Sequence, residues 1–224
     1  DTNSSYHDSI YWYKLEGNLT NSAPTIAKDK LKTTYYSAPI YSSQPGGNAG
    51  DRIRNGDCRI RSGYYQNGKI HCVYVRDNLD WGEIVYSRIN TATNTEEINT
   101  WGIANKNYLY PSIASFSEDT ITEDAMICFN RVGPNEYPQV CVVNYKNGWS
   151  PSSKVIKEGE GILDLLDYDS TSSSYERLGD YTGIQRRYNQ KACWLVGSYA
   201  FGDTTNLDLS HTNGLNAWIA EVGE

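Results

Sequence analysis

The chain has 224 residues, a net charge of −7 at pH 7 and 38% hydrophobic residues. This length allows one large domain with a buried core. The acidic balance argues against a nucleic-acid partner and against general attraction to an anionic membrane surface. No apolar run approaches the roughly 20 residues that a spanning helix needs, so we expect no transmembrane segment.

The composition favours strands over helices. There are 19 Tyr and 6 Trp but only 3 Phe and 1 Met, and Tyr, Thr, Ile and Val are residues that suit strands. Asn, Ser, Thr and Gly are plentiful, as expected for polar turns between short strands. The sequence therefore predicts an all-β fold.

Strand signals begin near the N-terminus and continue through the first half of the chain. The predicted strands are Ile10–Leu15, Thr33–Tyr41, Cys58–Tyr65, Ile70–Val75 and Glu83–Ile89. The pair Asn67-Gly68 separates the third and fourth of these runs, and Asn-Gly between alternating runs is a strong hairpin signal. The first run resembles the third strand of the repeating unit described next.

The same order of strands then recurs twice. The second copy is predicted at Tyr110–Phe116, Ala125–Phe129, Gln139–Tyr145 and Lys154–Ile156, and the third at Gly179–Ile184, Ala192–Tyr199 and Asn216–Val222. Counted from Asp57, Tyr110 and Gly179, the copies start about 53 and 69 residues apart, a spacing typical of propeller blades. An ordinary β-sandwich is the alternative, since it also has closely spaced strands.

We therefore predict one β-propeller domain, or a fragment of one, with four-stranded antiparallel blades. The blade segments are roughly residues 1–50, 51–105, 106–160 and 161–224. This gives three to three and a half blades, whereas propellers typically need four to eight to close. A partial propeller leaves apolar sheet faces exposed, so we expect the remainder of the propeller, or a partner protein, to complete it.

The five cysteines form no CxxC pair and no metal-binding spacing with the three histidines. A hairpin centred on residues 133–136 would place Cys128 directly opposite Cys141. This arrangement predicts either a cross-strand disulfide or two packed thiols, and the sequence leaves both open.

Basic residues gather locally on this acidic chain, at residues 52–54, 59–61 and 186–187. Such groups can hold an anionic sugar or another carboxylate. The alternative interpretation is that they pair with nearby Asp and Glu side chains.

The stretch Glu176–Asn189, with Trp194–Tyr199 and Trp218–Glu221 after it, resembles sialidase-like (BNR-type) propellers of exported bacterial proteins, including those of Bacteroidota. The similarity covers about half the chain, and its Gly-Asp-Tyr segment carries most of it. By this resemblance the protein is expected to be secreted or exposed at the cell surface. Leu178 stands where that family usually has Trp. The Ser-x-Asp-x-Gly-x-x-Trp boxes are absent, and Arg59-Ile60 is followed by Arg61 where the family has Pro.

Retaining sialidases use a tyrosine nucleophile with a carboxylate base, and arginines clamp the substrate carboxylate. Tyr181 lies beside Asp180 and after Arg177, so Tyr181 and Asp180 are the candidate catalytic residues. We predict that one pocket at the propeller axis is lined by Asp57, Arg59, Arg177, Asp180 and Tyr181. In the alternative, Asp180 caps a turn and pairs with Arg177, and Tyr181 packs between blades.

Two further groups of residues are candidates for binding. Aromatic residues at predicted turns and strand ends can stack on ligands, although most such rings in a propeller fill the space between blades: Tyr64, Tyr65, Trp81, Trp101, Tyr108, Tyr110 and Trp149. A carboxylate group at Asp164, Asp167 and Asp169 can hold Ca²⁺ through oxygen ligands, and a solvated acidic loop is its alternative. Otherwise we predict no cofactor and no metal site.

Three functions remain open from the sequence. The favoured one is a non-catalytic module that binds glycan or protein at a cell surface. The second is a sialidase-like glycoside hydrolase, and the third is a structural subunit of a surface or secretion assembly. Fold alone does not choose among them.

Overall fold

The computed structural model describes residues 7–17, 20, 24–39, 41–46, 52–79, 81–117, 119, 121–164, 175–188, 190–202 and 213–223. All regular structure in these ranges is β, with strands in four antiparallel sheets and no helix. The described ranges accordingly contain no helix of the length and hydropathy that spanning a bilayer requires. The predicted all-β class is confirmed.

Each sheet comes from one continuous stretch of chain, with consecutive strands paired. Sheet I is the hairpin of β1 (His7–Glu16) and β2 (Thr25–Tyr36). Sheet II consists of β3 (Ser62–Gln66), β4 (Lys69–Asp77), β5 (Gly82–Asn90) and β6 (Thr95–Trp101). Sheet III consists of β7 (Asn107–Ser115), β8 (Ala125–Gly133), β9 (Glu136–Tyr145) and β10 (Lys154–Lys157). Sheet IV consists of β11 (Gly183–Arg187), β12 (Ala192–Gly202) and β13 (Asn213–Gly223).

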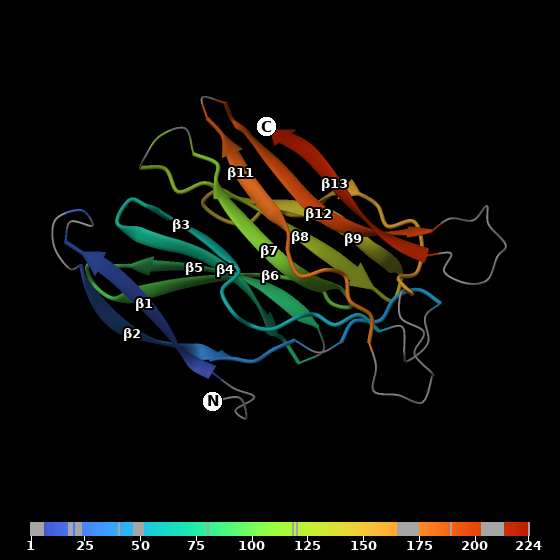
Figure 1. Cartoon of the computed structure of the whole chain (residues 1–224), viewed down its shortest axis with the longest axis horizontal. Coiled ribbons are helices and arrows are strands. Elements are labelled where there is room, and N and C mark those ends of the chain that lie inside the picture. The colour runs from blue at the N-terminus through green and yellow to red at the C-terminus, as the bar shows by residue number, and fades with distance from the viewer. Residues whose placement is uncertain are drawn as a thin grey trace.

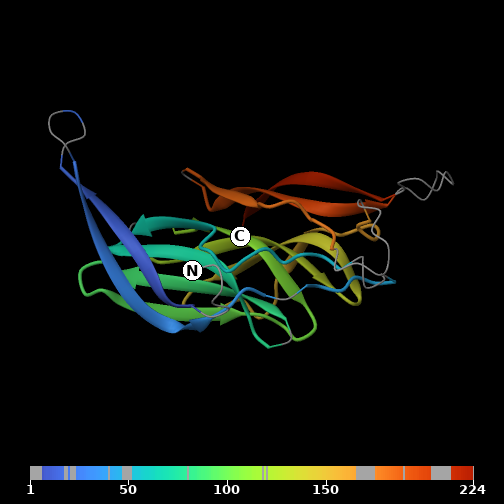
Figure 2. The same cartoon turned by 60° about the horizontal axis from the view of Figure 1, so that its bottom comes forward.

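The four sheets stack in chain order, face against face (Figures 1 and 2). Ile10 and Leu31 of sheet I pack on Tyr74 and Val85 of sheet II, and separate apolar clusters join sheets II and III and sheets III and IV. The end strands β3, β7 and β11 of successive sheets contact one another. No sheet closes on itself in the described ranges.

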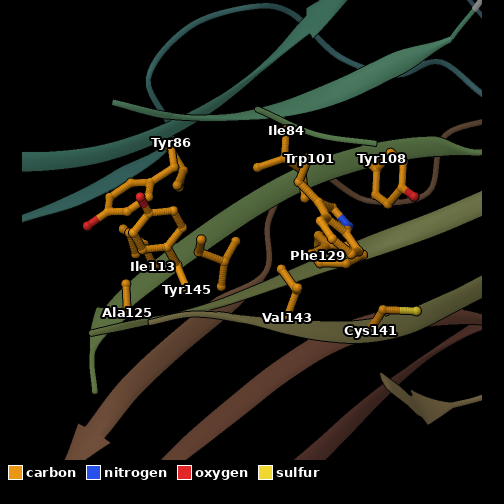
Figure 3. Close-up of a cluster of buried hydrophobic side chains, with 12 residues drawn as sticks. Ile84, Tyr86, Trp101, Tyr108, Ile113, Ala125, Phe129, Cys141, Val143 and Tyr145 are labelled. Carbon is orange, nitrogen blue, oxygen red and sulfur yellow. The ribbon is translucent and has the colours of Figure 1, made fainter. Parts of the chain in front are cut away.

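The core between sheets II and III is built from large side chains of both (Figure 3). Tyr86 and Trp101 project from sheet II, while Phe129 and Tyr145 project from sheet III; all four are almost entirely buried. The rings of Tyr86 and Tyr145 meet edge to face, 5.1 Å between centroids. Each buried aromatic side chain removes a large apolar area from water, so this interface holds the two sheets in a fixed relation.

The predicted hairpin at Asn67-Gly68 is confirmed, because both residues have positive φ and join β3 to β4. Other predictions were wrong in detail. β6 was not predicted at all, and within the described ranges β1 pairs only with β2 instead of serving as a third strand. The predicted strands at residues 58–65 and 179–184 begin only at Ser62 and Gly183, and the residues before them form loops.

The prediction that Cys128 lies opposite Cys141 was wrong. The register shifts between Arg131 and Gly133, so Cys128 faces Val142 and Cys141 faces Phe129. A shift of one residue moves a side chain to the other face of a sheet. Cys128 therefore packs towards sheet IV and Cys141 towards sheet II. All five cysteines are buried free thiols.

Candidate functional site

A pocket of about 270 Å³ lies where β3 and β11 begin, beside the first residues of β7. It is lined by Arg54, Gly56, Asp57, Arg59, Arg61, Tyr110, Arg177, Asp180 and Tyr181. All five residues that the sequence placed in one pocket are among them. We call this the arginine pocket.

Two loops form most of the wall, and backbone bridges hold them together. The Glu176 N–H donates to the Arg52 carbonyl at 2.8 Å. The Arg54 N–H donates to the Glu176 carbonyl at 3.0 Å. Ile53 and Leu178 are fully buried in one apolar cluster. Because alternate residues of an extended segment point to opposite sides, burying these two side chains leaves Arg54 and Arg177 at the pocket.

The floor of the pocket is strained. Tyr110 is buried, has φ of 50° and precedes a proline, which normally keeps the preceding residue extended. Its carbonyl accepts a hydrogen bond from the Thr182 hydroxyl at 2.5 Å, and its own hydroxyl donates to the Arg54 carbonyl at 3.3 Å. Gly56 has φ of 82°, and a Cβ there would lie 2.9 Å from the Tyr110 ring. Backbone strain of this kind clusters at ligand-binding sites.

Asp57 is held by two arginines. Its carboxylate accepts hydrogen bonds from the Arg59 backbone N–H at 3.0 Å, from Arg59 Nε at 2.7 Å and from Arg61 Nη2 at 3.2 Å. Burial acts to raise the pKa of Asp57, but the hydrogen bonds and charges of Arg59 and Arg61 outweigh it, so the pKa is lowered. The Asp57 carboxylate therefore stays ionised at neutral pH and holds the guanidinium groups of Arg59 and Arg61 in place.

The second ion pair lies on the other loop. Arg177 Nη2 donates to both carboxylate oxygens of Asp180, at 3.0 and 3.1 Å. That pairing was part of the alternative interpretation and is present. Tyr181, however, is 75% exposed and does not pack between sheets. In the part of the chain that the structure describes, no hydrogen bond joins its hydroxyl to either pocket carboxylate.

Four pocket residues were not in the predicted set: Arg54, Gly56, Arg61 and Tyr110. The basic groups at 52–54 and 59–61 were the signal for the two arginines. The guanidinium of Arg54 lies 5.2 Å from the Tyr175 ring, and no carboxylate of the described residues pairs with it. That of Arg61 lies 5.4 Å from the Tyr110 ring. The third basic group lies elsewhere, and there Arg187 pairs with Glu221.

The pocket carries four guanidinium groups against two carboxylates. It is therefore locally positive on a chain of net charge −7. Arginine presents a planar fork of donors that matches a carboxylate. The arrangement suits an anionic group of a ligand, with the tyrosine rings offering a surface for the rest of it.

The other candidate sites have different outcomes. Of the seven aromatic candidates, Trp101, Tyr108 and Tyr110 are buried, Tyr64, Trp81 and Trp149 are partly buried, and Tyr65 is largely exposed. Asp164 is described, while Asp167 and Asp169 lie outside the described residues. Across the described ranges, no three His, Cys, Asp or Glu side chains gather in a way that could hold a metal ion.

Comparison of the chain with family models, with curated protein sequences and with solved structures finds no match. The chemistry of the arginine pocket is therefore the main indication of function.

Proposed function

We propose that this protein is a non-catalytic module that binds an acidic glycan in the arginine pocket. The observation that carries the proposal is Arg54, a guanidinium in the pocket with no carboxylate partner among the described residues. Arg59 and Arg177 lie in the same pocket and are well exposed. A ligand carboxylate that enters there meets guanidinium donors from both loops, and little of the surrounding protein has to move.

Binding without catalysis fits the pocket better than hydrolysis does. A tyrosine nucleophile needs a base within hydrogen-bond reach, and Tyr181 has no such bond to a pocket carboxylate in the described part of the chain. Asp180 is already engaged by Arg177. A sialidase-like glycoside hydrolase remains the alternative, and a protein ligand with an exposed acidic side chain would use the same donors.

The test is isothermal titration with N-acetylneuraminic acid and glucuronic acid, with glucose as the neutral control. We expect the acidic sugars alone to bind, and Arg54→Ala to weaken that binding at least tenfold. Arg187→Ala is the matched control, because Arg187 lies outside the pocket and pairs with Glu221. Equal binding by wild type and Arg54→Ala would refute the proposal. Release of fluorophore from acidic fluorogenic glycosides would favour the hydrolase.

A separate observation supports a role in assembly. Tyr13, Leu15 and Ile26 are exposed on sheet I, and Trp194, Val196 and Ile219 are exposed on sheet IV. Val196 and Ile219 face each other across β12 and β13. The exposed residues of sheet IV therefore form one apolar patch at that end of the stack. We propose that the sheets are blades of a β-propeller, completed by further sheets of a longer chain or of a partner protein.

Native mass spectrometry of the protein from its source tests this second proposal. We expect a mass above the 25.2 kDa of this chain, and an Ile219→Asp variant that no longer assembles. A species of 25.2 kDa alone would refute it. Placement at the cell surface or in the extracellular space is part of the same proposal, and fractionation of the source cells tests it.

A further inference from the structure

A second pocket of about 280 Å³ lies beside the arginine pocket. It opens between the hairpin of sheet I and the chain before β3, and it is lined by His7, Ser9, Ile10, Tyr11, Tyr36, Cys58, Arg59, Ile60 and Tyr74. We call it the tyrosine pocket. Arg59 lines both pockets, and its side chain is 82% exposed.

Residues 57–61 form the wall between the two pockets. Asp57 and Arg61 line the arginine pocket, whereas Cys58 and Ile60 line the tyrosine pocket. The side chains alternate between the two pockets along this segment, which bends at residues 58 and 59. Arg59 is the member of this wall that borders both sites. A ligand that occupied both pockets would have to pass this side chain.

The chemistry of the tyrosine pocket differs from that of its neighbour. The rings of Tyr36 and Tyr74 lie 5.4 Å apart, and Tyr11 and Ile60 are about half exposed. The Tyr36 hydroxyl donates to the Ser9 carbonyl at 3.0 Å. Among the described residues, no carboxylate lines this pocket. Aromatic and apolar walls with a few hydroxyl groups are typical of sites that hold a neutral, ring-shaped group.

The sizes of the pockets favour one ligand for both. Ligand pockets commonly measure about 300–1,000 Å³, and each of these pockets alone is smaller. Taken together they fall within that range. We propose that the tyrosine pocket binds the neutral sugar attached to the acidic sugar in the arginine pocket, so that the ligand is an acidic oligosaccharide. This inference depends on the proposed glycan-binding function.

Calorimetry with N-acetylneuraminic acid and with 3′-sialyllactose tests the inference, because the second probe adds neutral sugars to the same acid. We expect wild type to bind sialyllactose about tenfold more tightly than the monosaccharide. Tyr11→Ala and Ile60→Ser should remove this tenfold gain and leave the Kd for the monosaccharide unchanged. Both residues are partly exposed, and the unchanged monosaccharide Kd also shows that each variant is folded.

Two control variants distinguish the contribution of one pocket from that of the other. Tyr188→Ala removes a tyrosine that is 79% exposed and lines neither pocket, so it should alter no Kd. Arg54→Ala should weaken both probes equally. If the two probes bind wild type equally, the inference is wrong while the glycan-binding proposal stands. If neither probe binds, both are wrong.

Discussion

Two clusters in this molecule use the same residue types in opposite ways. The arginine pocket combines arginines, carboxylates and tyrosines at the surface. A second cluster between sheets II and III combines Arg88, Glu123, Tyr86 and Tyr145 in the interior. The side chain of Arg59 is 82% exposed, and that of Arg88 is 12% exposed.

The charge of Arg88 in the interior cluster is matched within the protein, although its Nε has no hydrogen-bond partner among the described residues. Arg88 pairs with Glu123 at 2.9 Å and also with Glu97, and its guanidinium lies 5.2 Å from the Tyr145 ring. Lys69 pairs with the same Glu123 at 2.7 Å. Little capacity is left there for an outside ligand. Exposure and net charge, rather than residue type, separate the arginine pocket from the structural cluster.

The largest effect that tests this contrast is expected at Arg88. Arg88→Ala leaves Glu123 partly buried with one cation fewer, and breaking a buried ion pair costs about 3 kcal/mol or more. We expect urea denaturation to show a loss of about 3 kcal/mol in the free energy of unfolding. A loss below about 1 kcal/mol would show that the interior cluster is no more structural than the pocket.

A second effect concerns His71, which is fully buried beside Arg88 and Tyr64. Burial lowers the pKa of His71 from 6.5 to about 4. Its ring stacks on Tyr64 at 4.6 Å, and its Nδ1 lies 2.7 Å from the Tyr86 hydroxyl. Since the unfolded state takes up its proton near pH 6.5 and the folded state only near pH 4, stability falls as the pH drops between these values. The pKa difference corresponds to about 3 kcal/mol.

Urea denaturation from pH 7 to pH 4 measures this dependence. Carboxylates such as Glu123 also contribute to it, so the informative quantity is the difference between wild type and His71→Phe. Phenylalanine keeps a ring for stacking and does not titrate. We expect the variant to have a clearly shallower loss of stability over this range. Identical slopes would mean that His71 takes up its proton equally easily in both states.

The sequence predicted the strands that are rich in β-branched and aromatic residues, such as β4, β8 and β9. It missed β6, which contains Glu96 and Glu97 and follows a polar turn. The structure explains them, because Glu97 pairs with Arg88 and Glu96 accepts a hydrogen bond from the Ser87 hydroxyl at 2.5 Å. The sequence of a charged edge strand lacks a clear apolar pattern. Its strand conformation is explained only by its contacts with the neighbouring strand, here β5.

The pocket was predictable in part. Asp57 and Asp180 each precede the first strand of a repeated unit, so the sequence repeat predicted that their loops lie close together. Arg54 could not be assigned in the same way, because its position depends on the bridge between Arg54 and Glu176, which are far apart in sequence. The register of β8 and β9 was likewise unpredictable, since the shift at Arg131 leaves no signal in the sequence pattern.

A smaller effect tests how tightly the pocket floor is packed. Gly56 and Gly68 both have positive φ, but a Cβ at Gly56 would lie 2.9 Å from the Tyr110 ring, whereas one at Gly68 meets nothing within 4 Å. Placing an L residue in this conformation costs about 1–2 kcal/mol. We expect Gly68→Ala to lose about 1 kcal/mol and Gly56→Ala about 2 kcal/mol in urea denaturation. Equal losses would show that the Tyr110 ring moves aside freely.

The smallest effect on stability is expected within the arginine pocket itself. Arg59→Ala removes an ion pair with Asp57 that is open to solvent, and exposed pairs contribute about 0–1 kcal/mol. The free energy of unfolding should therefore change by less than about 0.5 kcal/mol, measured in parallel with Arg88→Ala. Arg59 can be lost at little cost in stability because its ion pair with Asp57 is exposed to solvent. A loss at Arg59 as large as that at Arg88 would place the pocket among the structural clusters and remove the contrast between the two regions.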